Sequence, residues 1–268
     1  MKIFKYIITT LFVLIVLFPI FYTLSASLFT LQDFTSTPAR IVTSQLTLIN
    51  YQRALSHNYY LRYLFNSLVM AVLGTTLRLS ISFLAAYAFA RFNFKGKDLC
   101  FLILLGTLFF PSDTLLQQNY LTVLHLHLTN NYLGLVITGL LGVSQIILLR
   151  LFFLSVPLSL YDTASIDGAG DYLIIKKILL PLSSPLLASL ALQSAISFFN
   201  SYLWPLVITD KINMRTIQIG ITMLGFSESL DFGPLFAAIS IILIPTIILF
   251  CFARKTIVKA LTKNYLYT

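Results

Sequence analysis

Six long apolar stretches, separated by short polar segments, constrain this chain of 268 residues more than any other feature. In a helix, with a rise of about 1.5 Å per residue, each stretch approaches or exceeds the thickness of a membrane hydrocarbon core, about 30 Å. Hydrophobic residues make up 58% of the chain and charged residues 10%, which excludes an ordinary soluble domain. The sequence therefore predicts an all-α, polytopic membrane protein. The expected spans are Ile7–Phe29, Leu64–Ala90, Leu99–Leu116, Leu133–Phe153, Leu186–Ile208 and Phe232–Phe252.

Two of these spans carry features that admit another interpretation. Lys2 and Lys5 precede the first apolar run, and Ser25-Ala26-Ser27 offers small residues, a pattern also typical of a secretory signal. The run is long enough to span, so we expect a retained first helix. Pro111 interrupts the third stretch and predicts a kink or an early exit there.

The distribution of basic residues predicts the orientation of the chain, because lysine and arginine in short loops favour the cytoplasm. They precede the first span and follow the second, fourth and sixth, whereas the opposite side has fewer over longer loops. Both termini are therefore expected in the cytoplasm. This topology accounts for the net charge of +9 without a nucleic-acid partner. The expected cytoplasmic residues are Lys2, Lys5, Arg91, Lys95, Lys97, Arg150, Lys176, Lys177, Arg254, Lys255, Lys259 and Lys263.

The sequence contains no pattern that predicts an enzyme, a metal site or a cofactor. It has no G-x-x-x-x-G-K-[ST] phosphate loop, so any ATP-driven step by that mechanism needs another polypeptide. His125 and His127 have no nearby cysteine or carboxylate cluster and are interpreted as interfacial side chains. Cys100 and Cys251 fall near expected cytoplasmic helix ends and are interpreted as free thiols.

A polar segment, Val156–Pro185, lies between two apolar stretches and must face water or a partner. Pro157 can open a short helix, because its missing N–H is one that the first turn leaves unpaired. Gly168 and Gly170 can end that helix through backbone angles that are costly for other residues. We therefore expect a helix followed by a glycine bend.

A second helix is expected directly after this bend. Asp171 is placed to cap it, with its carboxylate accepting free backbone N–H groups ahead of Tyr172. Pro181 and Pro185 are expected to disrupt its continuation. The segment is thus predicted to be helix, glycine bend, helix.

The same segment resembles the cytoplasmic EAA loop of ABC importer permeases. It reads Asp162-Thr-Ala-Ser-Ile-Asp-Gly168, nine residues, then Ile178-Leu-Leu-Pro181, so the glycine, isoleucine, leucine and proline are in register. The Glu-Ala-Ala start is replaced by Asp-Thr-Ala, which keeps the acid but shortens it. The alternative interpretation of this segment is an ordinary amphipathic connector between membrane helices. Its carboxylates would then serve helix capping and solubility. The resemblance implies that these residues couple to an ATPase: Asp162, Ala164, Asp167, Gly168, Ile178 and Pro181.

Other segments are similar to maltose-type carbohydrate permeases: Phe65-Asn-Ser-Leu, the run Leu84–Arg91, Phe94-Lys-Gly-Lys97 and Asn200–Pro205. The tail Lys263–Thr268 and Phe199, where tryptophan is usual, depart from that pattern. The resemblance implies a single permease domain, residues 1–268, of the six-helix type, with 156–185 as its cytoplasmic coupling loop. It implies a bacterial inner or plasma membrane location and, as partners, a cytoplasmic ATPase dimer, a second permease subunit and an extracytoplasmic solute-binding protein.

The solute is predicted less sharply than the class of transporter. Asn213–Gly220 resembles members that import glycerol phosphate, while oligosaccharides remain open. The loop Thr209–Asp231 would, by resemblance, face the binding protein. Trp204 is interpreted as part of an interfacial aromatic belt.

Polar residues within the expected spans are the candidates for a translocation path. Gln193, Ser197 and Asn200 follow helical spacing and precede Tyr202; they either line the path or bond between helices. Arg78 is a mid-span cation that either bonds to neighbouring carbonyls or offers a bidentate site to an anionic solute. A self-contained secondary transporter is the alternative function, but it would be expected to carry intramembrane acids or histidines for ion coupling.

Overall fold

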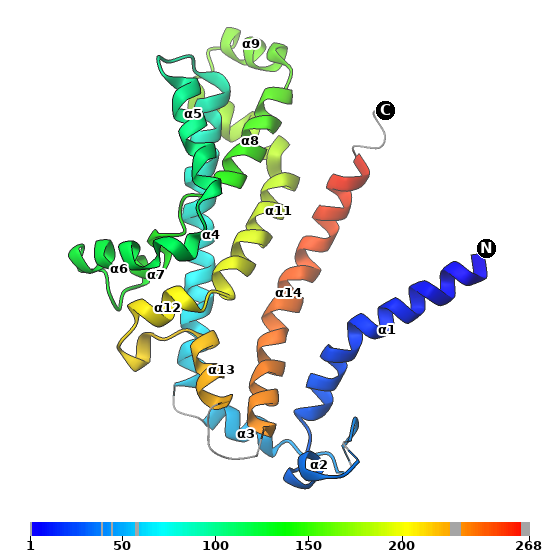
Figure 1. Ribbon diagram of the computed structural model, residues 1–268. Coiled ribbons are helices and arrows are strands. Elements are labelled where there is room, and N and C mark those ends of the chain that lie inside the picture. The colour runs from blue at the N-terminus through cyan, green and yellow to red at the C-terminus, as the bar shows by residue number, and fades with distance from the viewer. Residues whose placement is uncertain (1, 39, 44, 57–58, 226–231, 264–268) are drawn as a thin grey trace. The chain divides into compact units, whose positions relative to one another are not determined.

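The computed structural model describes residues 2–38, 40–43, 45–56, 59–225 and 232–263, and each regular element among them is helical (Figure 1). The all-α prediction is therefore confirmed. The chain divides into two compact units, one from Met1–Asn66 with Ile212–Ile248 and one from Ser67–Lys211 with Leu249–Thr268. The last residues of the tail, 264–268, and part of the 209–231 loop, 226–231, lie outside the described residues.

The first unit contains the N-terminal helix, the short helices that follow it, and the chain that leads into the last helix. Buried Asn50 ties these segments together by donating to the carbonyls of Ser27 and Phe29 at 3.0 and 2.7 Å. The Tyr60 hydroxyl donates to the Ala238 carbonyl at 2.8 Å. The elements are α1 (Lys2–Ala26), α2 (Leu31–Thr35), α3 (Ile49–Ser56), the start of α4 (Tyr60–Arg91), η4 (Ile212–Met214), α13 (Ile217–Gly225) and α14 (Gly233–Lys263).

The second unit is built on the rest of α4 and on the helices that the central part of the chain forms. It holds a hydrophobic core to which α4, α8, α9, η3 and α11 contribute, and it contains the polar segment identified above. Its further elements are α5 (Lys97–Gly106), η1 (Thr107–Phe109), η2 (Ser112–Leu115), α6 (Leu116–His125), α7 (Tyr132–Ile137), α8 (Val143–Ser155), α9 (Leu158–Ile166), α10 (Asp171–Ile174), the π-helical turn η3 (Ile175–Leu179), α11 (Leu180–Phe199) and α12 (Leu203–Ile208).

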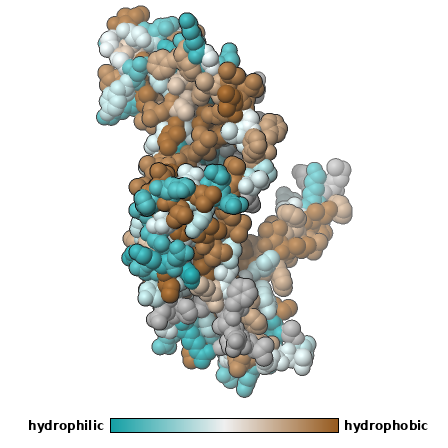
Figure 2. All heavy atoms as spheres, turned by 60° about the vertical axis from the view of Figure 1, so that its left-hand side comes forward, coloured by the Kyte–Doolittle hydropathy of each residue, from teal (hydrophilic) through white to brown (hydrophobic). Residues whose placement is uncertain are grey.

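Three continuous helices in the described part of the chain are long and apolar enough to cross a membrane: Phe4–Ala26, Tyr60–Arg91 and Asp171–Phe199. A fourth candidate is the pair α8 and α9, which is bent by 73° at a short break. Apolar side chains reach the surface widely in Figure 2, as lipid-facing helices require. The first, second and sixth expected stretches are confirmed as helical by α1, α4 and α14.

The three remaining stretches are not single helices, so their predicted boundaries were wrong. α5 ends at Gly106, and Phe110 is extended because Pro111 disfavours helical angles in the residue before it, so the helix is interrupted where Pro111 predicted a kink or an early exit. The stretch 133–153 is broken between α7 and α8, and the stretch 186–208 is broken after Phe199.

The expected disruption by Pro181 and Pro185 was also wrong, because one helical path runs from Asp171 to Phe199. The wide π-helical turn η3 lies directly before Pro181. The missing N–H of Pro185 leaves the Pro181 carbonyl without its helical donor, and the Ser184 hydroxyl supplies one at 2.8 Å. Serine side chains therefore repair the bonds that proline removes.

A buried carboxylate organises the chain between α1 and α3. The side chain of Asp33 is fully buried and pairs with Arg40 at 2.7 Å. It also accepts from the backbone N–H of Thr30 and the hydroxyl of Thr43, both at 3.0 Å. A buried charge is tolerated only when it is paired and hydrogen-bonded in this way.

We predict that Asp33→Ala destabilises the protein by about 3 kcal/mol, because it leaves the groups around the carboxylate unpaired. Thr35→Ala is the matched control on the same helix, since the Thr35 hydroxyl bonds only to carbonyls of its own turn. Thermal unfolding midpoints in detergent compare the two variants. Equal midpoints would contradict a stabilising role for Asp33.

Candidate functional site

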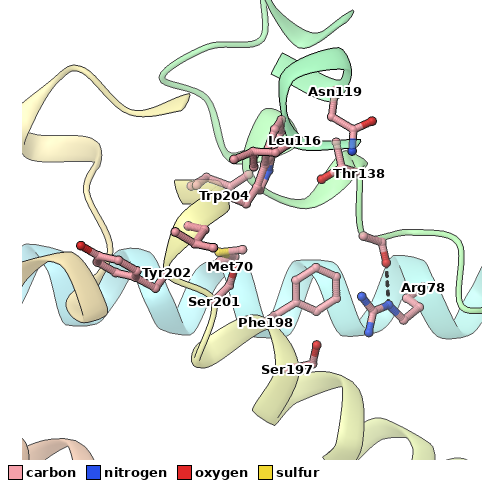
Figure 3. Close-up of a pocket in the computed structure, with 13 residues that line it drawn as sticks. Met70, Arg78, Leu116, Asn119, Thr138, Ser197, Phe198, Ser201, Tyr202 and Trp204 are labelled. Atoms are coloured by element: carbon pink, nitrogen blue, oxygen red, sulfur yellow. Dashed lines mark hydrogen bonds between the residues drawn. The ribbon is translucent and has the colours of Figure 1, made fainter. Parts of the chain in front are cut away.

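A polar-walled cavity of about 350 Å³ lies inside the second unit, where α4, α6, α7, α11 and α12 meet (Figure 3). Its wall combines one cation with hydroxyl, amide and aromatic side chains. This composition suits a polar ligand with apolar faces. The lining residues are Met70, Arg78, Leu116, Asn119, Leu135, Thr138, Gly139, Ser197, Phe198, Ser201, Tyr202, Leu203 and Trp204.

Arg78, near the middle of α4, is held in a fixed orientation at this cavity. Its Nε donates to the Gly139 carbonyl at 2.6 Å (Figure 3). Its guanidinium carbon lies 4.3 Å from the centroid of the Phe198 ring, a cation–π distance. In the described part of the chain the only ion pair is Arg40–Asp33, so Arg78 has no carboxylate partner there.

Glycines make room for this arrangement. A Cβ on Gly74 would lie 2.6 Å from the Phe198 ring, and a Cβ on Gly139 would lie 2.8 Å from it and 3.0 Å from a terminal nitrogen of Arg78. Such distances are shorter than real contacts. The two glycines therefore allow α4 and the segment after α7 to approach the Phe198 ring of α11 closely.

The cavity includes only some of the residues expected to line a path. Arg78, Ser197 and Tyr202 line it, whereas Gln193 and Asn200 are exposed and do not. A hydrogen bond between α8 and α11 is made by two neighbouring residues, with the Gln145 amide donating to the Ser194 hydroxyl at 3.3 Å. Of the predicted residues, Arg78, Ser197 and Tyr202 thus share one cavity.

Sequence reasoning missed several lining residues. The Trp204 indole N–H donates to the Gly134 carbonyl at 3.1 Å, and the side chain lines the cavity, a role that the predicted aromatic belt did not include. Asn119, Thr138 and Phe198 come from separate helices and carry no motif. The one sequence signal for this cavity was Gly139 within an apolar run, because backbone that approaches an aromatic ring closely needs glycine.

The polar segment 156–185 forms a second candidate site. α9 begins after Pro157, and Gly168 has a φ of +77°, which confirms both expectations. Gly170 has a φ of −76°, so the expectation that it also needs a special backbone angle was wrong.

Asp171 does not cap the following helix as expected, because Gly170 occupies the capping position and Asp171 is already the first helical residue. Its carboxylate accepts a hydrogen bond from the Tyr87 hydroxyl at 2.6 Å instead. The acid still lies in the first turn, where the helix dipole favours it. This bond connects the segment to α4.

A second contact fastens α9 to α4. The Tyr161 side chain is fully buried although it belongs to a connecting segment. The Arg91 guanidinium carbon lies 4.0 Å from the centroid of its ring. Burial raises the pKa of the Tyr161 hydroxyl above its ordinary value, and the Arg91 charge opposes that rise.

The outward side of the segment has free acids and apolar side chains together. Asp162, Asp167 and Gly168 are exposed, Ala164 packs at the edge of the core, and Ile178 is half-buried. Pro181 is exposed at the start of α11. Exposed apolar side chains on a polar segment mark an interaction surface. The largest of them are Leu158, Ile166 and Tyr172, with exposed fractions of 66%, 85% and 70%.

Membrane-length helices, a cavity lined by polar and apolar side chains, and an exposed polar segment anchored to the same helices fit the class of transport permeases. No protein-family model matches the chain. Curated relatives do. The trehalose/maltose transport system permease protein of Thermococcus litoralis is 35% identical over 262 residues, covering 96% of this chain and 93% of the relative.

Two further comparisons agree. The sn-glycerol-3-phosphate transport system permease protein of Rhizobium meliloti is 31% identical over 261 residues, covering 94% and 93% of the two chains. A chain of a bacterial ABC transporter involved in the import of the acidic polysaccharide alginate has a TM-score of 0.86 and 25% identity, with 95% of each chain covered.

The chain therefore belongs to the family of carbohydrate-uptake permease subunits of ABC importers. It is a multi-pass membrane protein and a transport subunit, not an enzyme. The relatives do not favour the alternative of a self-contained secondary transporter.

We predict that Gly139→Ala destabilises the assembled importer by about 1–3 kcal/mol, because the added methyl group must displace Phe198 or Arg78. Gly106→Ala is the control, since a Cβ there meets nothing within 4 Å. Thermal unfolding in detergent measures both. A Gly139→Ala protein as stable as the control would contradict this prediction, because it would show that Phe198 and Arg78 can move aside at little energetic cost.

Proposed function

We propose that this chain forms one half of the translocation path of an ABC importer for a carbohydrate or a polyol phosphate. The other half is a second permease subunit, and a cytoplasmic ATPase dimer drives both. An extracytoplasmic solute-binding protein delivers the solute. The observation that carries this proposal is that one core joins the exposed 156–185 segment to α4 and α11, and these two helices also line the polar cavity.

The proposed membrane topology has six crossings and cytoplasmic termini. α1, α4, α8, the Asp171–Phe199 path and α14 provide five of them, and α5 with the turns that follow provides the sixth. This order puts 156–185 on the same side as the termini, in agreement with the basic residues around it. As half of a heterodimer, the chain exposes Gln193 and Asn200 where the second subunit would complete the path.

Coupling is proposed to run through the exposed face of 156–185. Its apolar side chains would seat in a cleft of the ATPase, with the carboxylates of Asp162 and Asp167 meeting basic or backbone groups there. Gly168 supplies the bend that gives α9 its direction. Ala164 packs against the core, and Ile178 and Pro181 flank the core residue Leu179 in the chain; these three would carry the displacement inward.

The energy for the switch comes from the ATPase, because this sequence carries no phosphate loop. A ligand shifts a conformational equilibrium only by its differential affinity for the two states. Closure of the ATPase on ATP would displace α9 as a rigid lever. The attached α4 and α11 would then open the cavity alternately to the two sides.

The cavity and the relatives support the proposed solute class. The named relatives transport trehalose or maltose, glycerol phosphate and arabino-oligosaccharides, the last in Halalkalibacterium halodurans at 31% identity over 74% of this chain and 71% of the relative. Hydroxyl, amide and indole groups around Ser197, Tyr202 and Trp204 suit a polyhydroxylated solute with an apolar face.

We predict that Gly168→Val uncouples transport from ATP hydrolysis in the reconstituted importer, whereas Gly170→Val does not. A Cβ meets nothing within 4 Å at either position, so space does not distinguish them. Only Gly168 has a positive φ, where a side chain costs at least about 1 kcal/mol and would redirect α9.

Uptake and ATPase activity in proteoliposomes test this pair. The wild-type importer should hydrolyse ATP in response to its loaded binding protein and accumulate solute, and this chain alone should do neither. Normal coupling in Gly168→Val would remove the bend from the mechanism. ATP-independent accumulation by the chain alone would overturn the proposed function.

A further inference from the structure

We propose that Arg78 makes the cavity a recognition site for an anionic solute, one that carries a phosphate or a carboxylate group. This inference rests on the proposed function and specifies its substrate class. Among the described residues that line the cavity, Arg78 carries the one formal charge, and none of them is an aspartate or a glutamate.

The hydrogen bonds of Arg78 leave the part that binds anions free. A guanidinium has five N–H donors, and within the described residues Arg78 uses only Nε, on the Gly139 carbonyl. The two terminal nitrogens lie on the cavity side, beside Phe198 (Figure 3). Their paired N–H groups match the two oxygens of a carboxylate or phosphate.

The fixed orientation of the Arg78 guanidinium supports a role in binding an anionic solute. The Nε bond and the stack on Phe198 set the plane of the guanidinium, so little conformational freedom remains to be lost on binding. Asn119, Thr138 and Ser201 line the same cavity and can bond to the hydroxyl groups of a solute. An anionic polyol would therefore find both a counter-charge and polar partners.

Arg150 on α8 shows what a purely structural arginine of this kind looks like. Its Nε donates to the Phe89 carbonyl at 3.3 Å, and its guanidinium carbon lies 4.3 Å from the Phe101 ring centroid. These contacts reproduce those of Arg78, but Arg150 does not line the cavity. It therefore provides a matched control for the loss of a carbonyl bond and a stack.

The test is uptake by the complete reconstituted importer, with its partner subunits and binding protein. Three solutes serve as probes: sn-glycerol 3-phosphate, digalacturonate as a carboxylate, and neutral maltose. We expect the wild type to take up at least one anionic probe. Arg78→Gln should lower that uptake at least tenfold more than it lowers ATP turnover, and Arg78→Lys should restore part of it.

Arg150→Gln should not reduce uptake of the anionic probe relative to ATP turnover. Asn119→Asp provides a second test that leaves Arg78 in place, because it adds a nearly isosteric negative charge to the cavity wall. It should lower uptake of the anionic probe selectively, even if Arg78→Gln fails to assemble.

Three results would overturn the inference. Wild-type uptake of maltose alone would exclude an anion site while leaving the importer function intact. Parallel losses in Arg78→Gln and Arg150→Gln, with unchanged anion uptake in Asn119→Asp, would make Arg78 structural. Absence of uptake of both anionic probes would likewise overturn the anion site, whereas the proposed function would fall only if no loaded binding protein stimulated ATP hydrolysis by the importer.

Discussion

The core beneath the 156–185 segment is the constraint on which the second unit depends. Phe83 on α4, Phe153 on α8 and Tyr161 on α9 pack together, with a distance of 4.9 Å between the first two ring centroids. Leu179 in η3 and Leu190 on α11 complete this core. A close-packed interior transmits displacement instead of absorbing it. A force on α9 therefore reaches the helices that line the cavity.

Two polar contacts reinforce the connection between α4 and the 156–185 segment. The Tyr87–Asp171 hydrogen bond and the Arg91–Tyr161 stack both join the C-terminal end of α4 to the segment. At mid-helix the same α4 carries Arg78. One helix thus connects the surface proposed to receive the ATPase with the cation proposed to meet the solute.

Local chemistry made some of this structure predictable from the sequence. Long apolar runs indicated α1, α4 and α14, and the positive φ of Gly168 was predicted from a glycine at the end of a short helix. Predicted helix boundaries were wrong where another side chain compensates for the residue that was expected to end the helix. Pro185 continues a helix because Ser184 donates to the carbonyl that proline leaves free. Single-residue propensities contain no such information.

The cavity was the least predictable part, because it is assembled from separate helices. Phe198 carried no motif, and Trp204 was interpreted as part of an aromatic belt. Their places in the cavity depend on Gly74 and Gly139, which leave room for the Phe198 ring, and on the Gly134 carbonyl, which accepts from Trp204. Gln193 shared a helical face with Ser197 in the sequence, yet only Ser197 lines the cavity. Spacing predicts which residues share a face but not which face encloses a cavity.

The most direct test of the account is whether α9 and α4 move as one body. Spin labels at Ser159→Cys and Val72→Cys, both exposed positions of the second unit, report the distance between them in a background without Cys100 and Cys251. The assembled importer is measured without nucleotide and with a non-hydrolysable ATP analogue. The account predicts the same mean distance in both states. A distance that changes when ATP binds would show that the core yields, and would contradict a rigid lever.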